Sequence, residues 1–138
     1  MPSGLRERVV DVVRAAAAAE FKAYASLPRL ATRALAGHFT DGPARRRIVN
    51  LLRSHKARGW VISNDLNPST SDVLSARFVR LDGSRAIVAT EEYWYLRWFE
   101  SATGKYRKIY NKHNKQTYVL VNRRGKWLVD GNIYPSTS

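Results

Sequence analysis

Cysteine is absent from this chain of 138 residues, which excludes disulfide bonds, thiolate catalysis and zinc sites with thiolate ligands. The three histidines, His38, His55 and His113, are too far apart in the sequence to place two metal ligands on one helix or strand. There is also no glycine-rich phosphate loop, and no serine or threonine lies in a nucleophile-elbow context. We therefore expect no metal ion and no other cofactor.

Acidic residues are scarce as well, with 11 Asp and Glu against 24 Lys and Arg, and the formal net charge is +13. Two long intervals hold no acid at all, from Gly42 to Asn64 and from Ser101 to Val129. An excess of this size favours an acidic partner, which the charge alone does not identify: an acidic protein, a nucleic acid or an anionic membrane surface.

Long apolar runs are missing too. The longest near the N-terminus, Ala15 to Ala19, is too short and too closely flanked by charge for a signal peptide or a membrane span. We expect a soluble, cytoplasmic protein. The length suits one domain, which we place at residues 1–134, and the Pro-Ser-Thr-Ser sequence of residues 135–138 indicates a tail or linker.

The N-terminal part has the periodicity of helices. Apolar residues recur on a broad stripe over residues 5–24, which predicts a long, well-buried helix. A shorter helix is expected from Pro28 to Gly37, with Leu30, Ala34, Leu35 and His38 facing inward. A third is expected from Pro43 to Arg58, where Ile48, Leu51, Leu52 and His55 form the apolar stripe and Gly59 ends the helix.

From Trp60 onward the pattern changes to that of strands joined by turns, including a hairpin signal at Asp82-Gly83. With no alternation of strands and helices, this order predicts an α+β fold: three helices packed in a curved antiparallel sheet of about four strands, a half-open cone. The four long strands are expected at Val73–Leu81, Arg85–Phe99, Tyr106–Val121 and Lys126–Tyr134, and a short strand, Trp60–Ser63, precedes them.

The stretch from Glu91 to Glu100 holds five aromatic residues and is expected to be the central strand. Its alternation places Tyr93, Tyr95, Arg97 and Phe99 on one face and Glu92, Trp94, Leu96 and Trp98 on the other. The sequence does not decide which face is exposed. If the tryptophans fill the cone, the exposed rings predict a weak homodimer or a sheet covered by a partner. Glu91 and Glu92 are adjacent, so only one of them can point inward.

Several motifs occur in this order: Gly59-Trp60 after the third helix, the hairpin at Asp82-Gly83, the strand Arg85–Glu91, and the closing pair Gln116–Leu120 and Gly125–Asp130. Together they resemble the nuclear-transport-factor-two-like superfamily over nearly the whole chain, and within it the IMS domain of plastid-division scaffold proteins and their bacterial relatives. This resemblance implies a cone fold and a non-catalytic interaction module. The superfamily also contains isomerases and dehydratases, but those enzymes generally carry an extra hairpin between helices and sheet that this chain lacks.

Our leading hypothesis is a non-enzymatic scaffold or interaction module that binds an acidic or carboxylate-ended protein segment. Large rings provide contact area, and an arginine pairs with a carboxylate through two parallel hydrogen bonds. The expected groove is lined by the following residues: Tyr93, Trp94, Tyr95, Arg97 and Trp98.

The first alternative is a nucleic-acid-binding domain that uses the basic third helix and the Lys105 to Lys126 region. Its basic patch comprises Arg45, Arg46, Arg47, Arg53, Lys105, Arg107, Lys108 and Lys112. Between these cations, Tyr106 and Tyr110 either stack on bases or are core residues of a long strand. The second alternative is an isomerase- or dehydratase-like enzyme with Asp130 or His38 in the cone, although we expect Asp130 to be a buried acid paired with an arginine such as Arg97.

Overall fold

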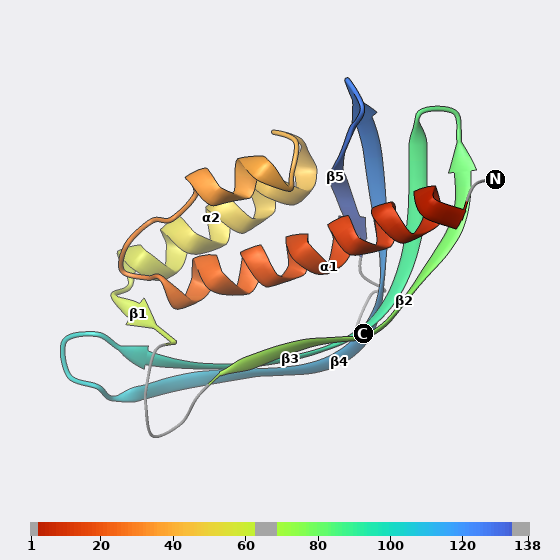
Figure 1. Cartoon of the computed structure of the whole chain (residues 1–138). Coiled ribbons are helices and arrows are strands. Elements are labelled where there is room, and N and C mark those ends of the chain that lie inside the picture. Colours follow the sequence, from red (N-terminus) through yellow and green to blue (C-terminus); the bar gives the residue numbers. More distant parts are fainter. Residues whose placement is uncertain (1–2, 63–68, 134–138) are drawn as a thin grey trace.

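Helices cover the concave face of a curled antiparallel sheet (Figure 1). The computed structural model describes residues 3–62 and 69–133. Over these ranges it has two α-helices, α1 (Ser3–Ala25) and α2 (Pro43–Ala57), and one short 3-10 helix, η1 (Arg33–Gly37), between them. None of these helices is long and apolar enough to cross a membrane. The predicted α+β class with a curved sheet is confirmed, whereas residues 135–138 lie outside the described ranges.

The long first helix and the basic third helix of the sequence prediction are confirmed as α1 and α2, but the helix expected from Pro28 to Gly37 is wrong. Only the single 3-10 turn of η1 forms there. Leu35 is its one buried residue, while Leu30 and Ala34 are exposed. A short helix is stable in a protein mainly through the apolar face that it packs, and one leucine does not provide such a face.

Over the described residues the sheet has five strands, with the long β3 (Arg85–Glu100) in the middle. One edge of β3 pairs with β1 (Trp60–Val61) and β2 (Thr70–Asp82), and the other pairs with β4 (Tyr106–Arg123). The tight turn expected between β2 and β3 is present, with Gly83 at a φ of 65° that favours glycine. The fifth strand, β5, spans Lys126–Ile133.

An unpaired sheet edge lies on β4, because β5 pairs with it only over residues 117–123. Among the described residues, no strand pairs with the outer edge of β4 over residues 106–116. The backbone groups of this edge are therefore available to an added strand, although the lysines along it discourage uncontrolled pairing. Lys108 and Tyr110 in this part of β4 line a pocket together with residues of α2, as described below.

A bulge in β5 changes the direction of its last side chains. Strict alternation would place Ile133 on the same face as Trp127 and Val129. Val119 of β4 pairs with Gly131, and the next residue, Leu120, pairs with Val129, so Asp130 has no partner on β4. Trp127 and Val129 face the core, and Ile133 is 60% exposed on the other face. An extra residue of this kind reverses the facing of all residues beyond it.

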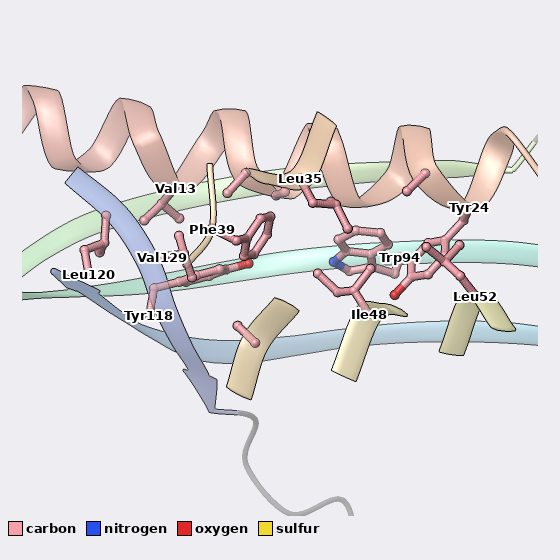
Figure 2. Close-up of a cluster of buried hydrophobic side chains, with 14 of the residues drawn as sticks. Val13, Tyr24, Leu35, Phe39, Ile48, Leu52, Trp94, Tyr118, Leu120 and Val129 are labelled. Carbon is pink, nitrogen blue, oxygen red and sulfur yellow. The ribbon is translucent and has the colours of Figure 1, made fainter. Parts of the chain in front are cut away.

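The core lies between the helices and the inner face of β3 (Figure 2). Val13 and Tyr24 of α1, Ile48 of α2, and Trp94 and Tyr118 of the sheet are all buried and meet there. This arrangement decides the orientation that the sequence left open. The tryptophan face of the central strand fills the cone.

The other face of β3 carries Tyr93, Tyr95 and Arg97, which are partly exposed. Phe99 departs from this set, because the register shifts between Trp98 and Phe99. Phe99 is buried, with its ring centroid 6.1 Å from that of Tyr106. The exposed aromatic patch is thus smaller than the three rings expected, and the weak homodimer stays a prediction.

Candidate functional site

A pocket of about 150 Å³ opens between α1, α2 and the inner face of β4, in the region that β5 does not reach. Two groups of residues line it. The largely apolar walls are Tyr24, Leu51, Trp94, Leu96 and Trp98. The polar residues are Glu20, Arg47, His55, Lys108, Tyr110 and Gln116.

The deepest charged group of the pocket is Glu20, on the buried side of α1. The Tyr24 hydroxyl donates a hydrogen bond to its Oε2 at 2.6 Å, and Arg47 Nη2 of α2 lies 3.5 Å from the same oxygen. Burial raises the pKa of the Glu20 carboxyl above its ordinary value of 4.5, while Arg47 and Tyr24 act in the opposite direction and the nearby Glu92 adds to the rise. Glu20 is thus a buried carboxyl that ionises less readily than a free one.

This environment predicts how stability changes with pH. A carboxyl whose pKa is higher in the folded protein binds its proton more tightly there. Its contribution to stability is present below the unfolded pKa of 4.5 and is lost as the pH rises through the folded pKa. The free energy of unfolding of the wild type minus that of Glu20→Gln is therefore expected to fall over the pH range above 4.5. Urea unfolding of both proteins across this range measures it, and a constant or rising difference would contradict the raised pKa.

At the mouth of the pocket, three cations surround one indole ring. The Trp60 centroid lies 4.9 Å from the Arg58 guanidinium carbon, 5.9 Å from that of Arg107 and 5.2 Å from Lys108 Nζ. We call Arg58, Arg107 and Lys108 the Trp60 cation cluster. Arg107 lies 3.8 Å from Glu100, but neither Arg58 nor Lys108 forms an ion pair with any other described residue. The cluster therefore carries positive charge that no described acidic residue neutralises.

His55 connects this cluster to the pocket. Its ring stacks on Trp98 at a centroid distance of 4.1 Å and meets Trp60 edge-on at 5.6 Å. Burial lowers the pKa of His55 from its ordinary value of 6.5, and Lys108 and Arg58 lower it further, against the hydrogen bond to the Leu51 carbonyl. A neutral imidazole adds no charge to the mouth at neutral pH, so the anion attraction there comes from the cation cluster.

The five residues predicted to line one groove lie on opposite faces of β3. Trp94 and Trp98 line the pocket on the inner face. Tyr93 and Tyr95 lie on the outer face with ring centroids 6.5 Å apart, and the guanidinium of Arg97 lies 5.9 Å from the Tyr106 ring. Successive side chains of a strand point to opposite faces of the sheet, so the two tryptophans and the other three residues form separate surfaces. No groove contains all five.

The predicted basic patch is likewise divided. Arg47 points into the pocket and pairs with Glu20, and Arg107 and Lys108 join the Trp60 cation cluster. The remaining members lie at the surface, where Arg45 is half-buried and the others are exposed. These are Arg45, Arg46, Arg53, Lys105 and Lys112. The interpretation of Tyr106 and Tyr110 as core residues is wrong, because they are 46% and 38% exposed.

The two residues considered for catalysis lie outside the pocket. Asp130 accepts a hydrogen bond from Thr40 Oγ1 at 2.7 Å, next to the start of α2, so the expected pairing with Arg97 is wrong. His38 lies half-buried in a separate hollow between α1 and η1. Over residues 3–62 and 69–133, no group of three or more His, Asp or Glu side chains is arranged to hold a metal ion.

Sequence reasoning missed Glu20 and Gln116. A signal for Glu20 was present, because it lies at the i+4 position after Ala16 and before Tyr24, on the apolar stripe of the first helix. A carboxylate in such a stripe indicates a buried, paired acid. Gln116 carries no comparable signal, since its burial depends on where β4 pairs with β3.

No protein-family model matches the chain, and no curated protein shows significant sequence similarity to it. Among solved structures, it is similar to the intermembrane space region of the chloroplast protein ARC6. The TM-score is 0.67 at 14% sequence identity, and the match covers 96% of this chain and 97% of that one. At this identity the likeness concerns the fold. It supports the resemblance to the IMS domain at that level, while the wider superfamily stays a prediction.

Proposed function

We propose that this chain is a non-catalytic interaction module that binds an acidic or carboxylate-ended protein segment in a groove between α2 and β4, formed by the Trp60 cation cluster and the mouth of the pocket beside it. The observation that carries the proposal is the Trp60 cation cluster, in which Arg58 and Lys108 have no acidic partner among the described residues. Carboxylates of a partner would pair with these cations, and an apolar side chain next to them would contact the Trp60 ring. The fold similarity to an intermembrane space region is compatible with this function.

The unpaired edge of β4 adds a second means of binding. An extended segment laid along residues 106–116 gains backbone hydrogen bonds, while its alternate side chains reach the cation cluster. Each exposed ion pair contributes only about 0.2–1 kcal/mol, so affinity requires several such pairs together with the backbone contacts. Binding by exposed charges also weakens as salt is added.

The first test uses a fluorescein-labelled extended peptide that contains several Asp and Glu and one Leu. Lys108→Ala is expected to weaken its binding about fivefold, because one ion pair at the groove is lost. Arg8→Ala, which removes the same charge from an exposed position of α1, is the matched control and should change the affinity less than about twofold. Fluorescence anisotropy measures both. Equal losses in the two variants would mean that net charge alone attracts the peptide, and the groove would then have no role.

Nucleic acid is the second candidate partner, favoured by the exposure of Tyr106 and Tyr110 between the lysines of β4. Rings in this setting can stack on bases. Two results would favour this candidate instead: an oligonucleotide displaces the acidic peptide, and the Tyr106→Ala variant binds that oligonucleotide more weakly than the wild type does. The prediction that the protein is not an enzyme stays a prediction, although Glu20 and Arg47 do meet in a pocket.

A further inference from the structure

The pocket holds a hydrogen-bond acceptor that lacks a donor. Gln116, on the inner face of β4, is only 4% exposed. Its Nε2 donates to Asn114 Oδ1 at 3.0 Å, but its Oε1 has no hydrogen-bond partner among the described residues. Buried side-chain oxygens nearly always accept a hydrogen bond. A ligand in the pocket with an N–H or O–H group would satisfy this one.

The charges around the pocket favour a neutral ligand. Glu20 is already engaged by Tyr24 and Arg47, and Lys108 lies at the rim. A cationic ligand would meet Arg47 and Lys108 at close range. An anionic ligand would be attracted by Arg47 and Lys108, but a carboxylate has no N–H or O–H group to donate to Gln116 Oε1 and would lie close to the Glu20 carboxyl. An uncharged group that both donates and accepts hydrogen bonds avoids each repulsion.

The walls of the pocket favour a flat and small body. Trp94 and Trp98 are nearly fully buried, and Tyr24 meets each of them edge-on at a centroid distance of 6.3 Å. Planar rings pack well against such walls. The pocket volume of about 150 Å³ is below the roughly 300–1,000 Å³ of sites for drug-sized ligands. It suits a molecule with one ring.

We propose that this pocket is a binding site for a small, flat, uncharged molecule that carries a primary amide. The amide N–H donates to Gln116 Oε1, its carbonyl faces the cations of Arg47 and Lys108, and its ring lies against the two tryptophans. This site goes beyond the proposed function, because its ligand is a small molecule inside the pocket and not a protein segment on the cation cluster.

The test compares three probes of nearly equal shape and different charge: benzamide, benzoate and benzamidine. Each is titrated into the full chain while the indole N–H signals are followed by NMR. Benzamide should shift the signals of Trp94 and Trp98 saturably and leave that of Trp60 in place. Benzoate and benzamidine should bind at least about fivefold more weakly than benzamide. This factor corresponds to the free energy of about one hydrogen bond. Equal binding of all three probes, tighter binding of a charged one, or no saturable shift would overturn the proposal.

Variants separate the amide contact from simple packing. Gln116→Leu keeps the volume and removes the acceptor, so it should lower the benzamide affinity about fivefold or more. Gln116→Met is a second variant if the first does not fold. Arg58→Ala is the control, because Arg58 belongs to the cation cluster and does not line the pocket. Unchanged benzamide binding in a folded Gln116 variant, or an equal loss in Arg58→Ala, would contradict the assignment.

Discussion

Glu92→Ala is expected to lower the free energy of unfolding by about 3–5 kcal/mol. Glu92 is fully buried on the inner face of β3. Its carboxylate accepts hydrogen bonds from Thr90 Oγ1 at 2.6 Å, Trp94 Nε1 at 2.8 Å and the Tyr118 hydroxyl at 2.7 Å. Figure 2 labels two of these donors, Trp94 and Tyr118, among the buried side chains of the core. Alanine would remove the acceptor that these three side chains share, and a buried donor that loses such a hydrogen bond costs roughly 1–3 kcal/mol.

The neighbouring residue provides a matched control. Glu91 lies on the outer face, where its Oε1 is 2.7 Å from Nε2 of His113 in an exposed pair. Glu91→Ala removes the same side chain one position away and should cost at most about 1 kcal/mol. Urea unfolding of the wild type and both variants measures the difference. Similar losses for the two alanine variants would show that the hydrogen-bonded cluster around Glu92 contributes little to stability.

The fold was predictable where periodicity is strong. The stripe of α1, the stripe of α2 and the alternation of β3 are each set by residues close together in the sequence, and all three elements formed as predicted. Adjacent acids at positions 91 and 92 were expected to divide between inside and outside, and they do. The segment before α2 was mispredicted, because Pro28 and a few small residues suit a helix start without providing a face to bury.

The candidate site was predictable only in part, because it depends on strand register. Pairing of Trp98 with Lys108, and of Trp60 with Glu100, brings the end of α2 next to the start of β4. This register places Arg58 and Trp60 next to Arg107 and Lys108, almost 50 positions later in the chain. The sequence showed two acid-free basic intervals and did not show that they meet at one indole ring. Nor did it show which side of β3 faces the helices.

Reversal of the charges at the mouth of the pocket is the second large effect that we expect. Arg58→Glu combined with Lys108→Glu replaces two attractions for an acidic segment with two repulsions. At about 1 kcal/mol for each attraction lost and about 0.5 kcal/mol for each repulsion gained, the affinity for the acidic peptide should fall about 150-fold. Both residues are exposed and form no ion pair among the described residues, so the fold should tolerate the change.

The most direct measurement compares the affinities of the wild type and this double variant for two peptides of opposite charge. Wild type and the double variant are each titrated by fluorescence anisotropy with the acidic peptide and with a version in which every Asp and Glu is replaced by Lys. Binding at the Trp60 cation cluster predicts that the wild type prefers the acidic peptide and that this preference is largely lost in the double variant, although its net charge is still strongly positive. If the double variant prefers the acidic peptide as strongly as the wild type does, the cation cluster is not the binding site.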